Sequence, residues 1–180
     1  VCSMADLFGD WVPLEWIHDV IEKCVENDSN NYLFLTKNPK RYIEVLANYD
    51  LSNMWFGTTI TGSEELSDIT EITSIMRNLK NTYKNINLFV SVEPMLKNIS
   101  VMNRIAIADI FDWIIIGAES GNRKEKVIPD HKWIIALCSA CELRGKSVFM
   151  KDSIVKLFGE SKKKYIRRII PSELRKGDKS

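Results

Sequence analysis

The chain has 180 residues, 45% of them hydrophobic and 27% charged, and its formal net charge is +1. This length suits one domain with a real core, and the composition is ordinary for a globular protein. No apolar run approaches the roughly 20 residues that a membrane helix needs, and no basic region followed by an apolar one opens the chain. We therefore expect a cytoplasmic protein with no membrane partner.

Positive charge is concentrated at the end of the chain. Residues 151–180 hold ten Lys or Arg and four Asp or Glu, so the remainder is acidic. This asymmetry predicts a domain over residues 1–152 and a basic C-terminal extension over residues 153–180. Residues 162–168 are the part of the extension that could contact nucleic acid, with Tyr165 available for stacking. The alternative is a solvated end of the chain.

Short apolar runs alternate with amphipathic segments along the chain. The apolar runs predict strands at residues 1–6, 32–37, 54–60, 86–94, 113–116 and 147–151. Apolar residues recurring at three and four positions predict helices at residues 13–27, 38–48, 64–83, 101–110 and 130–144. Such alternation is typical of βαβ units around a parallel sheet. We expect an α/β fold, a partial (β/α) barrel of about six parallel strands. A doubly wound parallel sheet is the alternative, because periodicity does not separate the two.

Polar side chains stand where the predicted strands end, which is where parallel α/β folds collect their chemistry. These strand-end residues are Asp6, Lys37, Thr58, Thr59, Glu93, Glu119 and Lys151. Charges that converge on one mouth are costly to bury unless they pair with one another or with a ligand. We therefore expect a pocket for a polar, zwitterionic or anionic small molecule. The alternative is that these residues form salt bridges or reach water.

The cysteines and histidines give weaker signals. Cys138 and Cys141 have CxxC spacing, but they lie in an apolar helical run, where thiols are more often core residues than a metal or redox site. His18 and His131 both lie on predicted helices and suggest packing or surface roles. We therefore expect no metal site.

Five short motifs carry a family resemblance. They are residues 1–8, 35–39, 91–96, 117–121 and 149–151, which read VCSMADLF, LTKNP, SVEPML, GAESG and FMK. In this order and spacing they resemble the phage protein Gp-thirty-seven/Gp-sixty-eight family, over about residues 1–152. That family in turn resembles radical S-adenosylmethionine (SAM) enzymes.

The resemblance implies roles for the strand-end residues. Enzymes of the radical SAM type bind SAM in the loops at the strand ends. The matching candidate contacts are Ser3, Asp6, Thr58, Thr59, Gly117, Glu119 and Ser120. Lys37, Glu93 and Lys151 are candidate catalytic or substrate-binding residues.

Members of that family also carry an N-terminal segment whose three cysteines ligate an iron–sulfur cluster. The chain begins at its Cys-Ser-Met strand, and Cys2 and Cys141 do not match the cluster cysteines. Because three thiolates are needed to hold such a cluster, none is expected on this chain alone. We interpret the chain as the C-terminal portion of a radical-SAM-like protein, which would be a radical SAM enzyme if that segment precedes it.

Two other functions stay open. The first is a lyase or aldolase that forms a Schiff base on Lys37 or Lys151, since a desolvated lysine is nucleophilic. The second is a non-enzymatic binding module whose basic extension contacts nucleic acid. We also expect self-association, because a partial barrel leaves an exposed sheet edge beside residues 1–6.

Overall fold

The computed structural model describes residues 6–47, 49–121 and 124–174, and of residues 160–162 it describes the backbone alone. Five strands form one parallel sheet in the order β1-β2-β3-β4-β5. They are β1 (Tyr32–Thr36), β2 (Met54–Thr59), β3 (Asn87–Val92), β4 (Trp113–Ile116) and β5 (Ser147–Met150). The α/β class and the parallel sheet are confirmed.

A barrel and a sixth strand, the finer part of the prediction, are not shown by the described residues. The described sheet has five strands and is open. The predicted first strand falls on residues 1–6, of which all but Asp6 lie outside the described residues. The doubly wound alternative is compatible with an open parallel sheet. However, each strand here neighbours the next one in sequence, and right-handed crossovers that all step the same way place their helices on one face.

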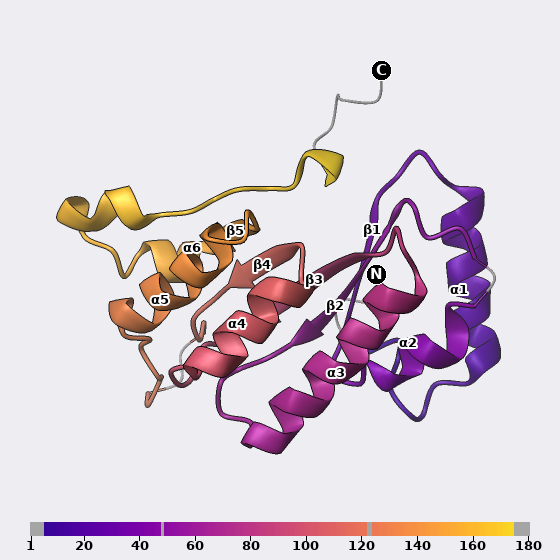
Figure 1. Cartoon of the computed structure of the whole chain (residues 1–180), viewed down its shortest axis with the longest axis horizontal. Helices are drawn as coiled ribbons and strands as arrows, with labels where there is room; N and C mark the ends of the chain where they lie inside the picture. The colour runs from indigo at the N-terminus through magenta and orange to yellow at the C-terminus, as the bar shows by residue number, and fades with distance from the viewer. Residues whose placement is uncertain (1–5, 48, 122–123, 175–180) are drawn as a thin grey trace.

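Six α-helices of the described part cover one face of the sheet. They are α1 (Leu14–Glu26), α2 (Lys40–Val45), α3 (Leu66–Thr82), α4 (Val101–Ile110), α5 (His131–Glu142) and α6 (Asp152–Val155). Figure 1 shows α3, α4 and α5 side by side along the strands. No helix of the described part is long and apolar enough to cross a membrane.

α2 and α3 are among the helices that are shorter than predicted, and local contacts explain both. α2 ends at Val45 because the chain then turns toward β2, where the Asp50 carboxylate accepts the backbone N–H of Ser52 at 3.0 Å. α3 begins at Leu66 and not at Glu64. The Glu64 carboxylate instead accepts the backbone N–H of Thr61 at 2.6 Å, which fixes the loop before the helix.

Each strand contributes to two cores, because successive side chains point to opposite faces. The helix face of the sheet carries the larger core, with Phe34, Phe56, Val90, Ile114 and Val148 all buried. The opposite face carries Leu33, Trp55, Phe89, Trp113, Ile115 and Phe149. We call this second surface the aromatic face. Burial on both faces explains why the strands read as uninterrupted apolar runs.

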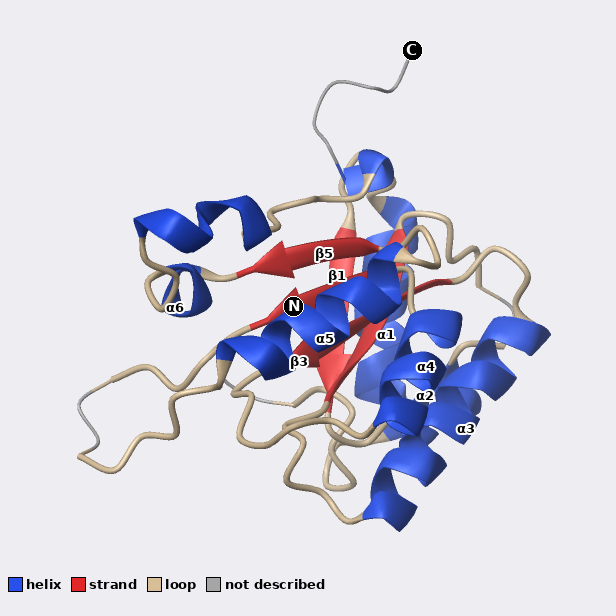
Figure 2. Cartoon of the chain, turned by 60° about the vertical axis from the view of Figure 1, so that its left-hand side comes forward, coloured by secondary structure: helices blue, strands red, loops and turns tan. Residues whose placement is uncertain are grey.

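Residues 166–174 cross the aromatic face, and we call them the C-terminal strap. Arg168 forms an antiparallel bridge with Phe149, so the strap covers the outer edge of β5 (Figure 2). The Trp113 indole N–H then donates to the carbonyl of Ile169 at 3.1 Å. Near its end, the carbonyl of Glu173 accepts from the Asn31 side chain at 3.0 Å, just before β1.

The described part of the predicted extension is therefore packed against the domain and is not a separate segment. α6 lies against β5, and Leu174 packs onto the aromatic face. The arginines of the strap are also engaged, since Arg167 pairs with Glu142 and Arg168 with Asp152. Charge count alone could not reveal this, because each partner is distant in sequence.

Candidate functional site

Glu93 and Lys151 meet at the carboxyl-terminal edge of the sheet. Glu93 follows β3 and Lys151 follows β5, and the Lys151 Nζ lies 2.7 Å from the Glu93 Oε2. Both side chains reach solvent, with 29% of the Glu93 side chain and 47% of the Lys151 side chain exposed. The predicted convergence of these two strand ends is thus present as an ion pair.

Gly117 makes this pair possible. It follows β4, the strand that lies between β3 and β5. A Cβ atom at position 117 would lie 2.5 Å from the Glu93 Oε1, closer than real Cβ contacts come. The Glu93 side chain therefore crosses the end of β4 through space that only a glycine leaves open. All three residues stand at predicted strand ends, but local sequence does not reveal that the Glu93 side chain passes over Gly117.

Two hydroxyl groups and an aromatic ring lie in the neighbouring row of the sheet, two residues before Glu93 and Lys151 on their own strands. Thr59 and Ser91 are neighbours in register, and this row continues through Ile115 to Phe149. By strand alternation these side chains share the aromatic face with Glu93 and Lys151. The Arg168 guanidinium lies over the Phe149 ring, 4.9 Å from its centroid. The mouth thus combines one charge of each sign with hydroxyl groups.

Asp6 anchors the end of β1. Its Oδ1 accepts the backbone N–H of Phe8 at 3.0 Å, and its Oδ2 accepts the N–H of Lys37 at 3.0 Å and the Thr36 hydroxyl at 2.9 Å. A carboxylate with three donors already has its hydrogen-bonding capacity largely used. Asp6 therefore holds a loop, and it is less suited to a ligand than predicted.

Lys37 is exposed and does not join the pair. It follows β1, two strands away from Glu93, which at the usual strand spacing is about 10 Å. Among the described residues, the ion pair of Glu93 is with Lys151 and not with Lys37. Of the three predicted catalytic or substrate-binding residues, the structure brings two together.

Thr58 is not at the mouth. It is fully buried and lies on the helix face in register with Thr36 and Val90. Its hydroxyl has no hydrogen-bond partner among the described atoms. Thr59, on the opposite face, is therefore better placed than Thr58 to contact a ligand at the strand ends. Ser3 lies outside the described residues.

The loop after β4 is held by its own polar groups. The backbone N–H of Ala118 donates to the Ser153 hydroxyl at 3.0 Å. The Glu119 Oε2 accepts the N–H of Val127 at 2.7 Å, and Ser120 is exposed. Glu119 thus ties the loop to the segment before α5, while Ser120 remains accessible from solvent.

The three described cysteines lie in the core of the protein. Cys24, Cys138 and Cys141 are buried, as predicted for core residues. Burial raises the pKa of the Cys138 and Cys141 thiols to about 12, so both stay protonated at neutral pH. The described residues contain no group of three His, Cys, Asp or Glu side chains that could hold a metal ion. They therefore do not fit an iron–sulfur cluster, which needs converging thiolates.

Sequence reasoning missed a polar hollow at the amino-terminal edge of the sheet. Asp112 directly precedes β4, Lys146 directly precedes β5, and Lys80 lies in the last turn of α3. The sequence does carry a signal for this hollow, since charged residues stand directly before these strands. It was overlooked because parallel α/β proteins usually carry their chemistry at the opposite edge.

Fold and geometry together define an α/β protein with an open parallel sheet and an ion pair bridging its strand ends. A family model described as protein of unknown function (DUF5131) matches residues 1–170, and the chain belongs to this family. The match continues through most of the strap, in agreement with its packing against the sheet. No curated protein and no solved structure matches the chain.

Proposed function

We propose that this chain binds a small zwitterionic ligand at the carboxyl-terminal edge of its sheet. Lys151 would receive the ligand's carboxylate and Glu93 its ammonium group. The observation that carries the proposal is the Glu93–Lys151 pair over Gly117. An exposed ion pair contributes only about 0–1 kcal/mol to stability, so folding alone gives little reason for a glutamate to cross a neighbouring strand.

A zwitterion suits the pair because it brings one charge of each sign. Its carboxylate replaces Glu93 as the partner of Lys151, and its ammonium replaces Lys151 as the partner of Glu93. No unpaired charge is left behind, which avoids the main cost of desolvating ionic groups. Charge-assisted hydrogen bonds of this kind are roughly twice as strong as neutral ones. The hydroxyls of Thr59 and Ser91 supply further polar partners beside them.

S-adenosylmethionine is the candidate that the family resemblance suggests, since its methionine part carries both an ammonium and a carboxylate. In this proposal the chain's own residues bind and orient that part of the ligand. The described cysteines do not fit an iron–sulfur cluster, so no radical step is assigned to this chain. A radical SAM activity of a longer protein would need three cysteine ligands from elsewhere.

The test is a binding titration by calorimetry, using SAM, methionine and N-acetylmethionine. Wild-type protein should bind the first two, and N-acetylation should abolish binding because it removes the ammonium charge. Glu93→Gln and Lys151→Met should each weaken binding about tenfold or more, the worth of one charged hydrogen bond. Glu26→Gln is the matched control, since Glu26 forms an exposed pair with Lys23 on α1. Equal affinities of wild-type and Glu93→Gln protein would refute the proposal.

The geometry gives less support to the two other functions. A Schiff-base lysine needs desolvation, yet Lys37 is exposed and 47% of the Lys151 side chain is exposed. Nucleic-acid binding by residues 162–168 would have to compete with the ion pairs of Arg167 and Arg168. Tyr165, the expected stacking residue, packs against the core.

A further inference from the structure

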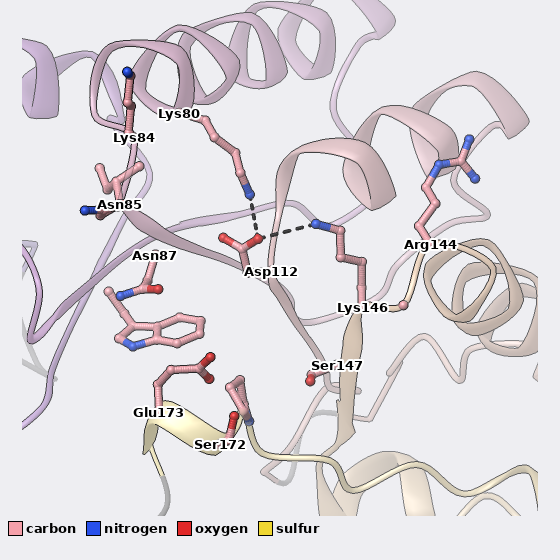
Figure 3. Close-up of a pocket in the computed structure, with 14 residues that line it drawn as sticks. Lys80, Lys84, Asn85, Asn87, Asp112, Arg144, Lys146, Ser147, Ser172 and Glu173 are labelled. Atoms are coloured by element: carbon pink, nitrogen blue, oxygen red, sulfur yellow. Dashed lines mark hydrogen bonds and ion pairs between the residues drawn. The ribbon is translucent and has the colours of Figure 1, made fainter. Parts of the chain in front are cut away.

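The amino-terminal edge of the sheet carries a polar hollow of about 560 Å³, opposite the edge with Glu93 and Lys151. Its walls come from the end of α3, the starts of β3, β4 and β5, and residues 171–173 of the C-terminal strap. Figure 3 shows Lys80 and Lys146 pointing toward Asp112 from two sides, with Ser172 and Glu173 across the hollow. We call it the basal groove.

Cations outnumber carboxylates in the basal groove. Its charged lining is Lys80, Lys84, Arg144 and Lys146 against Asp112 and Glu173, and Arg144 is already paired with Asp109, which lies outside the lining. The Asp112 carboxylate is already saturated with donors. Its Oδ1 accepts from both Lys80 and Lys146, and its Oδ2 accepts the N–H of Leu88 at 3.1 Å. One carboxylate therefore serves two ammonium groups, which leaves a surplus of positive charge.

Lys146 has unused hydrogen-bonding capacity in this groove. An ammonium group has three donors, and Lys80 uses two of its own, on Asp112 and on the carbonyl of Ile110. Among the described residues, the Lys146 ammonium has one partner, Asp112 at 3.3 Å, although only 19% of its side chain is exposed. Donors with little access to water favour an acceptor ligand. Lys84 stands at the rim, exposed and without an ion pair among the described residues.

We propose that the basal groove binds a phosphate group. A phosphate brings negative charge and several acceptor oxygens, which match the spare donors of Lys146 and the free ammonium of Lys84. A cationic ligand would instead face the ammonium groups of Lys80, Lys84 and Lys146. The volume is within the range of small-ligand sites, so a nucleotide fits, and the open rim also admits the backbone of a nucleic acid. Of the two carboxylates in the described lining, Asp112 already has two ammonium partners, so Glu173 is the one that would repel such a ligand.

The experiment measures the affinity of the full chain, at low salt, for inorganic phosphate, ADP and a short single-stranded oligodeoxynucleotide. Lys84→Ala and Lys146→Met should each weaken phosphate binding about tenfold, as expected for one charged hydrogen bond. Glu173→Gln should strengthen it, because the repulsion is removed. Lys132→Ala is the control, since Lys132 is an exposed lysine on α5 in the first turn, remote from the groove.

Tighter binding of ADP than of inorganic phosphate supports the proposal and indicates that the bound phosphate group belongs to a nucleotide. Tighter binding of the oligodeoxynucleotide, with a steep salt dependence, supports the proposal and indicates that the bound phosphate group belongs to a nucleic acid. Binding of none of the three probes would overturn it, and so would affinities that neither Lys84→Ala nor Glu173→Gln changes. Lys84 and Glu173 are exposed, so these variants test the groove even if Lys146→Met fails to fold. Glu93→Gln should leave phosphate binding intact, which separates this site from the proposed function.

Discussion

Replacing Gly117 with alanine places a methyl group where the Glu93 side chain now lies. The new Cβ would lie 2.5, 2.6 and 2.7 Å from the Oε1, Cδ and Cγ atoms of Glu93. Ordinary contact begins at 3.4 Å, so the carboxyl group must move by roughly 1 Å. All three atoms belong to one flexible, partly exposed side chain. The methyl group therefore displaces Glu93 and leaves the backbone of β4 in place.

The cost in stability should be small. The lost ion pair contributes at most about 1 kcal/mol, and replacing glycine by alanine returns about 0.4–1 kcal/mol through the unfolded chain where the backbone allows it. Gly117 is not among the described glycines with positive φ, so alanine fits its backbone. The net change in the free energy of unfolding should stay within about 1 kcal/mol. Ligand affinity should nevertheless fall about tenfold, because Glu93 no longer sits beside Lys151.

The assay pairs urea denaturation with the calorimetric titration described above. Gly159→Ala is the control, since a Cβ at position 159 meets nothing within 4 Å. Two results would refute the reasoning. If Gly117→Ala binds the ligand as tightly as the wild type, the pair is not the site. If it unfolds the protein, Glu93 is fixed by packing and its position does not reflect ligand binding.

Three further predictions concern the rest of the chain. Asp112→Ala should lower the free energy of unfolding in urea by about 2–3 kcal/mol, because two lysines and a backbone N–H lose their shared acceptor, whereas the exposed Asp19→Ala should change it little. Cys138 and Cys141 should resist alkylation, mapped by mass spectrometry, until the protein is denatured. Because burial raises the pKa of both thiols from 9.0 to about 12, stability should fall as the pH rises above about 9, and a flat profile from pH 9 to 11 would contradict this. Sedimentation velocity should show self-association through β1, which pairs only with β2 among the described strands, and Leu35→Lys should reduce it.

The strand positions were predictable because strands buried on both faces leave uninterrupted apolar runs. Their ends were predictable too, since Glu93 and Lys151 stand where those runs stop. Local sequence does not reveal the register of the sheet, that is, which residues of neighbouring strands lie side by side. Only the pairing of β3 with β4, and of β4 with β5, shows that the Glu93 side chain crosses Gly117.

The other differences between prediction and structure come from the side of the sheet on which a residue lies and from contacts between residues far apart in sequence. Thr58 and Thr59 are adjacent and chemically alike, yet strand alternation buries one under the helices and leaves the other at the mouth. The strap has a basic composition that suggested a solvated end. Its contacts depend on residues such as Glu142 and Asn31, which no local pattern connects to it.

The strap also bears on how the protein folds during synthesis. Asn31 and Glu173 are 142 residues apart in sequence, and their hydrogen bond ties the beginning of the sheet to the end of the chain. Because the N-terminal part leaves the ribosome first, Trp55, Phe89 and Trp113 are made long before the residues that cover them. Contacts of such long sequence separation also form late in folding. Nascent chains stalled before residue 166 should therefore bind a hydrophobic dye, and chains released after residue 174 should not.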